Sequence, residues 1–441
     1  MKKIISFIVL ALFLPFFVLF AQEVDNTRDK AVTEGLQVAV FDIDITPPVG
    51  YKMSYGVVKN SWDIGLRAKG IVLSGSGEPV VLVSLDWLGI ANDCYDEFKR
   101  SLARAARTMP ERVAIHVVHQ HDAPYPEDYL NDSFVLSVIH RLEMAVVNSL
   151  ENTIPVTHIG LGEAQVYKVA SNRRILGTDG KVKATRWTTC KDSTLRAEPE
   201  GLIDPMLSAV SFWNKESPVA VLNFYATHPQ SYYGTGVPNP DFPGIARFYR
   251  QLAMPDALQV YFTGAGGNVG AGKYNDGSHE NRAILAGRVA DGMKRALENT
   301  RRTSVIASDI QWSFEPVSLP LDSAKAGEVL WDRHQAGKKT DLQCLTISDK
   351  ARILFMPGEL LVEYQVAAKK MRPNLFVAMA AYGDLGVGYV PTAAAFPQGG
   401  YEVDVAKVTP EAETVLLNAI SKLLDELLRG RATKYQKRVS N

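Results

Sequence analysis

Short apolar segments alternate with amphipathic segments along most of the chain. Runs rich in Val, Ile and Leu, most of them bounded by turn residues, are typical of buried β-strands. They occupy Gln37–Asp42, Ala68–Ser74, Pro79–Ser84, Val113–Val118, Val219–Ala226, Leu258–Thr263 and Arg352–Met356. Apolar residues at helical spacing predict helices over Asn92–Thr108, Asp132–Glu151, His279–Asn299 and Pro410–Leu428. Because strands and helices are mixed throughout, we expect an α/β fold of layered mixed β-sheets flanked by helices, not a bundle or a sandwich.

The N-terminal stretch has the pattern of a secretory signal peptide. Two lysines precede an apolar run, Ile4–Phe20, and polar sequence follows Ala21. We therefore interpret residues 1–21 as a signal peptide cleaved after Ala21 and residues 22–36 as a linker, which predicts a periplasmic or secreted protein. An uncleaved anchor is the alternative, since the run is nearly long enough to cross a bilayer. We expect no membrane span in the mature chain.

Composition narrows the class of protein. Of the 441 residues 46% are hydrophobic, enough for a large core, and 48 Lys and Arg balance 48 Asp and Glu, which argues against a nucleic-acid partner. No linker or internal sequence repeat divides the chain, so we expect one domain over 37–430 and a polar tail over 431–441. Cys94, Cys190 and Cys344 are too few for a disulfide framework or a thiolate zinc site, although one disulfide is allowed.

A His-x-His pair follows one predicted strand. Side chains alternate along an extended backbone, so His119 and His121 should point the same way, with His116 on the other face or deeper. Two imidazoles on one face suit a metal ion. For an isolated pair, two hydrogen-bonded loop histidines are an equally good interpretation.

Three further segments place polar groups after predicted strands or in Gly-rich loops. His228 is a second strand-end histidine, and zinc sites draw ligands from separate strands. Glu359 is expected to begin a helix that runs to about Lys370, where it could ligate a cation, act as a base or favour the positive helix end. Tyr389 and Tyr401 could be rim aromatics, or a phenolate could bind zinc, since a cation lowers the phenol pKa.

Taken in order, these segments resemble the neutral (non-lysosomal) ceramidase family. The matching segments are Asp44-Ile-Thr-Pro-Pro48, His119-Gln-His121-Asp-Ala-Pro124, Thr227-His228-Pro229 with Asp241-Phe-Pro-Gly244, Pro357-Gly358-Glu359, and Tyr389-Val-Pro-Thr392 with Tyr401-Glu402. The ordered set spans about Ala39 to Leu428. The resemblance implies a ceramidase-like zinc hydrolase domain over most of the chain.

The resemblance also implies site residues. The implied Zn²⁺ ligands are His119, His228, Glu359 and Tyr389. A zinc-activated water would attack an amide (N-acyl) or ester carbonyl, while His121 and Tyr401 near the scissile bond stabilise the oxyanion or protonate the leaving group. Arg173 would contact a polar or anionic part of the substrate.

One segment departs from the family. Ceramidases carry Gly-Asp-Val-Ser-Pro, whose Ser has been proposed as the nucleophile, but this chain has Gly267-Asn-Val-Gly270. Activated water is therefore the expected attacker, and the glycines should let the backbone approach the site closely. Asp42, Asp44 and Asp86 either orient the ligands or form structural hydrogen bonds.

Two alternative functions stay open at this point. On the same scaffold the enzyme could act on a glycan or glycolipid, cleaving a glycosidic or a sugar N-acyl bond. The chain could also be a non-catalytic binding protein. The sequence does not determine the oligomeric state.

Overall fold

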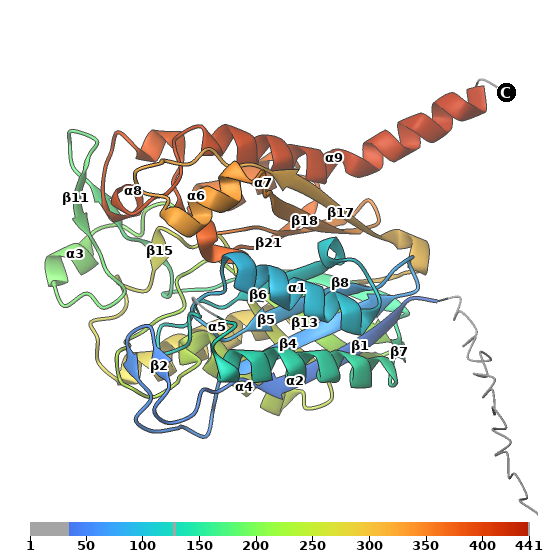
Figure 1. Cartoon of the computed structure of the whole chain (residues 1–441), viewed down its shortest axis with the longest axis horizontal. Coiled ribbons are helices and arrows are strands. Elements are labelled where there is room, and N and C mark those ends of the chain that lie inside the picture. The colour runs from blue at the N-terminus through green and yellow to red at the C-terminus, as the bar shows by residue number, and fades with distance from the viewer. Residues whose placement is uncertain (1–34, 127–128, 440–441) are drawn as a thin grey trace, which may run out of the picture. The chain divides into compact units, whose positions relative to one another are not determined.

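Three large β-sheets, with helices packed on them, make up the fold of residues 34–441 (Figure 1). The structure is a computed structural model that describes residues 35–126 and 129–439, without the side chains of 426–439. The expected signal peptide, 1–21, and almost all of the expected linker, 22–36, lie outside the described residues.

The first sheet has the order β6-β5-β4-β1-β7. Its strands are β1 (Gln37–Asp44), β4 (Arg67–Ser74), β5 (Val80–Leu85), β6 (Val113–Val117) and β7 (Ile154–Pro155). Helix α1 (Asn92–Ala106) connects the parallel strands β5 and β6, and α2 (Ser133–Leu150) follows β6. Asp132 caps α2 by accepting the N–H groups of Phe134 and Val135.

The second and third sheets have the orders β14-β13-β12-β8-β16 and β17-β18-β19-β21. The second contains β8 (His158–Gln165), β12 (Met206–Asn214), β13 (Ser217–Tyr225), β14 (Leu258–Thr263) and β16 (Arg301–Ser304), with helices α4 (Asp241–Ala253) and α5 (Glu280–Glu298). The third contains β17 (Ile310–Val317), β18 (Thr340–Ile347), β19 (Ala351–Phe355) and β21 (Phe376–Ala380), with α7 (Val362–Met371) and α9 (Ala412–Val439).

Shorter elements complete the described part of the chain. The short strands are β2 (Lys52–Met53), β3 (Gly56–Val57), β9 (Ser171–Asn172), β10 (Arg174–Leu176), β11 (Val182–Thr185), β15 (Val269–Gly270), β20 (Glu359–Leu360) and β22 (Tyr389–Val390). The short helices are α3 (Ser193–Ala197), α6 (Glu328–Gln335) and α8 (Tyr401–Asp404).

The three sheets share one topology, although the sequence shows no repeat. In each, three strands pair antiparallel in succession, a helix leads to a fourth strand parallel to the third, and another helix follows. We call these β1–α2, β8–α5 and β17–α9 the first, second and third repeats. Topology depends on the order of apolar segments and not on residue identity, so it can recur without sequence similarity.

Hydrogen bonds join the three parallel strand pairs at their carboxyl ends. The backbone N–H of Val117 donates to the carbonyl of Tyr382 at 3.0 Å, and that of Ala381 donates to Thr263 at 2.9 Å. The Thr263 hydroxyl donates to the carbonyl of Val118 at 2.9 Å. The loops that follow these strands therefore start from a common rigid point, which is where α/β proteins place their chemistry.

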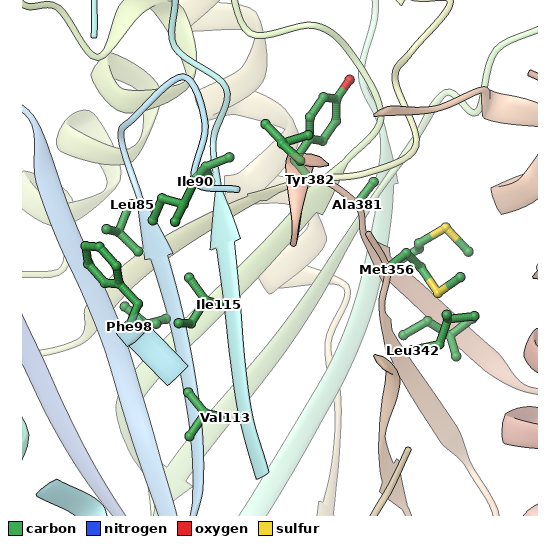
Figure 2. Packing of buried hydrophobic residues seen from close by; sticks show 14 of the residues in the cluster. Leu85, Ile90, Phe98, Val113, Ile115, Leu342, Met356, Ala381 and Tyr382 are labelled. Carbon is green, nitrogen blue, oxygen red and sulfur yellow. The ribbon is translucent and has the colours of Figure 1, made fainter. Parts of the chain in front are cut away.

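Apolar side chains fill the space between the sheets and under the helices. One cluster gathers inward-facing residues of all three sheets, including Leu82, Leu222 and Ile353. A second runs from α1 and β5 to the third sheet, and Figure 2 shows part of it, from Phe98 to Leu342. Among the described helices α2 has the length and composition to cross a membrane, but it packs its apolar face into this second cluster as a core helix does.

The structure corrects one sequence expectation. Glu359 does not begin a helix, because it lies in strand β20 and α7 starts only at Val362. Helix α9 runs to Val439, and the Lys- and Arg-rich segment after Leu428 keeps helix propensity where the apolar periodicity stops. The three cysteines are all buried free thiols.

Candidate metal centre

Four side chains that are far apart in the sequence meet at the junction of the three repeats. His119 follows β6 of the first repeat, and His228 follows β13 of the second. Glu359 and Tyr389 belong to the third repeat, where β20 and β22 pair in parallel with these two residues opposite each other. The structure thus brings together all four ligands that the family resemblance implied.

The distances within this group are short. Nε2 of His119 lies 3.3 Å from Oε2 of Glu359, and Nε2 of His228 lies 3.2 Å from the same oxygen. The Tyr389 hydroxyl is 3.2 Å from Nε2 of His228. The ligand atoms of the two histidines and Glu359 all lie within 4.8 Å of one another, and the three residues are buried. This group could hold a metal ion.

Backbone carbonyls fix the orientation of both imidazoles. Nδ1 of His119 lies 2.7 Å from the carbonyl of Leu88, and Nδ1 of His228 lies 2.7 Å from the carbonyl of Gly266. A carbonyl only accepts, so each Nδ1 carries a proton, and in the neutral imidazole Nε2 then presents a lone pair. Burial, followed by the charge of Arg173, lowers the pKa of His228, which keeps this imidazole neutral.

The donor set fits a cation. Oε2 of Glu359 is buried and has no hydrogen-bond donor among the described residues, while two lone-pair nitrogens face it. Three acceptors turned toward one point repel one another unless something positive lies between them. Two imidazoles, a carboxylate and a phenol are ligands that Zn²⁺ accepts.

His121 lies beside this group and lines the same cleft. Its ring stacks on Tyr55 at a centroid distance of 5.0 Å, and Tyr233 lies 4.7 Å away. The side-chain nitrogen of Gln230 is 3.0 Å from its Nε2. Burial holds the pKa of His121 well below its usual range, and His119 and His228 add to the effect. This histidine is therefore neutral at pH 7.

Arg173 lies behind Tyr389. Its Nη2 donates to the Tyr389 hydroxyl at 3.0 Å, and its Nε donates to Glu402 at 2.6 Å. Arg174 also donates to Glu402, at 2.8 Å. Burial opposes the charge of Arg173, but Tyr389 and Glu402 outweigh burial and raise its pKa. Arg173, which the sequence predicted to contact the substrate, thus makes these contacts with other residues of the protein.

Tyr401 lies at the rim of the site. Its ring centroid is 5.6 Å from that of Tyr389 and 5.0 Å from that of Trp187. The side chain is 37% exposed, which leaves its hydroxyl accessible from the cleft. The structure places this predicted residue next to Tyr389 of the ligand group.

The ligand group opens into a cleft of about 700 Å³. Tyrosines and charged side chains dominate its wall, among them Tyr51, Lys52, Tyr55, Tyr125, Asp132, Tyr401 and Lys407. His119, His121, Glu359 and Tyr389 also line it. The cleft therefore gives a solvent-borne substrate access to His119 and the Glu359 carboxylate.

Gly266 and Gly267, at the start of the segment that departs from the family, lie close to the backbone of the segments that carry His228 and Glu359. A Cβ on Gly266 would lie 2.9 Å from the backbone of Thr227, and one on Gly267 would lie 2.7 Å from the carbonyl of Glu359. Gly266 also supplies the carbonyl that orients His228. Gly270, which stands where the family has its Ser, would bring a Cβ to 3.9 Å from that of His228.

His116 lies outside the site, buried within β6. Its Nδ1 contacts the Ser84 hydroxyl at 2.9 Å, and its Nε2 accepts the N–H of Thr263 at 2.9 Å. Because the ring is fully buried, its pKa falls to about 3. This neutral histidine connects the first repeat to the second.

Acid should therefore weaken the fold through His116. In the unfolded chain histidine has a pKa near 6.5, so it binds a proton below that pH. In the folded protein His116 stays unprotonated down to about pH 3. The unfolded state is therefore favoured increasingly as pH falls below 6.5, and stability is lost. Replacing His116 by Gln removes this contribution. The difference in unfolding free energy between wild type and H116Q should shrink by about 2 kcal/mol between pH 7 and pH 5 in urea titrations. A difference that stayed constant between pH 7 and pH 5 would contradict the prediction.

Sequence reasoning missed the groups that support the ligands. Leu88 and Gly266 act through backbone carbonyls, which carry no side-chain signal. Asp86, considered as an orienting group, instead forms a buried ion pair with Arg247, at 2.8 and 2.6 Å. Asp42 binds Arg67 and Lys69.

The fold is similar to that of solved ceramidases. The crystal structure of neutral ceramidase from Pseudomonas aeruginosa matches with a TM-score of 0.64 and 16% sequence identity, over 90% of this chain and 75% of that chain. A ceramidase complexed with C2 matches with a TM-score of 0.65 and 16% identity, over 90% and 76%. No protein-family model and no curated protein matches the sequence. The chain therefore has a ceramidase-like α/β fold.

Proposed function

We propose that the protein is an exported zinc-dependent hydrolase that cleaves an amide (N-acyl) or ester bond. The observation that carries this proposal is the buried oxygen of Glu359, which faces two lone-pair nitrogens and lacks a donor among the described residues. The ceramidase-like fold supports hydrolysis as the reaction class. The basic and then apolar N-terminal segment supports a periplasmic or extracellular location.

His119, His228, Glu359 and Tyr389 would hold the ion. Bound Zn²⁺ supplies a Lewis acid and makes water acidic enough to attack a carbonyl at neutral pH. The Leu88 and Gly266 carbonyls keep both Nε2 atoms aimed at the ion.

Residues of the cleft wall handle the charge that the reaction develops. Neutral His121 lines the cleft beside the ligand group, where its ring N–H can donate a hydrogen bond to an oxyanion. Tyr401 presents its hydroxyl at the rim for the same purpose. Arg173 holds the Tyr389 hydroxyl in place, so we assign it as a positioning residue rather than a substrate contact.

A glycan or glycolipid substrate is the second candidate, favoured by the polar wall of the cleft. Tyrosine faces together with Lys52, Lys407 and Asp132 suit a hydroxyl-rich or acidic sugar better than a bare acyl chain. On this alternative the scissile bond is a sugar N-acyl or a glycosidic bond.

Metal analysis and substrate assays test the proposal together. Purified protein should contain about one equivalent of zinc, and dialysis against a chelator should abolish hydrolysis, which added Zn²⁺ restores. Short-chain fluorescent ceramide, an N-acetylated oligosaccharide and an acyl ester would separate the substrate classes. Full activity without metal would refute the proposal, and stoichiometric zinc without turnover of any class would favour a binding protein.

A further inference from the structure

A strained tyrosine packs against the candidate metal centre. Tyr382 follows β21 and has φ = +61°, a left-handed conformation that is an outlier for a bulky side chain. Its N–H donates to the carbonyl of Gly358 at 2.9 Å, and its carbonyl accepts the N–H of Val117 at 3.0 Å. These two bonds hold the strained backbone between the first and third repeats. Such conformations persist where the surroundings enforce them, and they gather at functional sites.

The ring of Tyr382 lies against both candidate histidine ligands. Its centroid is 4.8 Å from that of His119, with the planes 31° apart, and 6.1 Å from that of His228. His119 itself has φ = +73°, so two strained residues face each other here. In Figure 2 the Tyr382 ring extends from the end of the strand, away from the aliphatic side chains of the cluster.

The hydroxyl of Tyr382 is buried without a partner. The side chain is completely inaccessible, and its Oη has no hydrogen bond among the described residues. Burial raises the pKa of Tyr382 well above its usual range, and the charge of Glu359 adds to the effect, so the hydroxyl keeps its proton. A buried hydroxyl without a partner destabilises a fold, so a hydroxyl kept beside the candidate ligands is expected to have an acceptor when the site is occupied.

We propose that Tyr382 is a positioning residue of the metal centre, whose hydroxyl donates a hydrogen bond to the Glu359 carboxylate when the ion is bound. Glu359 holds the one buried carboxylate oxygen of this group that lacks a donor, and Tyr382 holds a donor that lacks an acceptor. Carboxylates that bind metals are commonly held by such a hydrogen bond, and losing it weakens metal binding or activity by roughly 10- to 100-fold. The inference rests on the proposed function.

Tyr382→Phe tests the hydroxyl alone, because the ring and the strained backbone stay. We expect Zn²⁺ affinity, measured by competition with a chromophoric chelator, to fall by roughly 10- to 100-fold. The visible absorption bands of the Co²⁺-loaded protein should shift, and the metal-free variant should unfold at the same or a higher temperature. A merely structural hydroxyl would not change the Co²⁺ bands.

Tyr225→Phe is the matched control. Tyr225 is also fully buried, in the core beneath α4 and α5, and this variant should keep the wild-type zinc affinity and Co²⁺ spectrum. Wild-type affinity and an unchanged spectrum in Y382F would overturn the role of Tyr382 while leaving the proposed function intact. Wild-type protein that binds neither ion would instead overturn the proposed function and this inference with it.

Discussion

Replacing Glu359 by Gln should empty the metal centre and reduce hydrolysis roughly a thousandfold or more, since a Lewis acid contributes several kcal/mol to the reaction. The substitution keeps the shape of the side chain but removes the charge that two lone-pair nitrogens face across 3.2 and 3.3 Å. Zinc content of the purified variant and its kcat/KM are the measurements. The fold should persist, because the neutral amide can donate to one of the two nitrogens.

A second glutamate provides the control for this prediction. Glu363 lies on α7, four residues further along, and accepts a hydrogen bond from Asn268 at 2.9 Å. Glu363→Gln should retain zinc and stay within a few-fold of wild-type kcat/KM. If E359Q kept stoichiometric zinc and wild-type turnover, Glu359 would not be a ligand and the proposed chemistry would need another centre.

Replacing Arg247 by Leu should cost about 3 to 5 kcal/mol of unfolding free energy, because it leaves Asp86 charged and buried without its partner. Both Arg247 guanidinium Nη atoms donate to Asp86, and the two side chains are 3% and 0% exposed. This pair connects α4 of the second repeat to the strand end of the first. Chemical denaturation of R247L at pH 7 gives the loss directly.

Two further variants test whether the loss of stability comes from the unpaired charge of Asp86. Arg250→Leu lies on the same helix without an ion pair to a buried carboxylate, so it should change stability by only about 0.5 kcal/mol. Asp86→Leu combined with R247L should recover much of the lost stability, since removing both charges also removes their desolvation cost. A double variant as unstable as R247L would show that packing, not charge, dominates at this site.

The strands that the sequence predicted best are nearly continuous apolar runs that are buried on both faces, whereas β8, β12, β17, β18 and β21 were not predicted. Leu258–Thr263 has the same bounds in sequence and structure, and β5 and β19 differ by one residue at each end. Such runs fix where strands lie, but not how sheets associate. The threefold recurrence of one topology therefore became visible only in the strand pairing.

The side-chain types of the candidate ligands could be read from the sequence, whereas the groups that hold those side chains in place could not. Imidazole, carboxylate and phenol at strand ends carry a chemical signal that survives in the sequence. Glu359 was expected at a helix start because Pro-Gly followed by an apolar segment resembles one, yet it pairs with Tyr389 in a two-residue strand. Pairing of that kind depends on tertiary contacts, and so do the positive φ angles of His119 and Tyr382.

The candidate ligands come from all three repeats, so a bound ion would also link the repeats to one another. His119, His228, and the Glu359–Tyr389 pair come from different repeats, so one bound cation would cross-link segments that are separated by more than a hundred residues. The ligands are close together only in the folded protein, so the cation would bind the folded chain and not the unfolded one. Its binding free energy would therefore add to the folding free energy. Removing zinc would then lower the stability of the entire molecule rather than that of one surface loop.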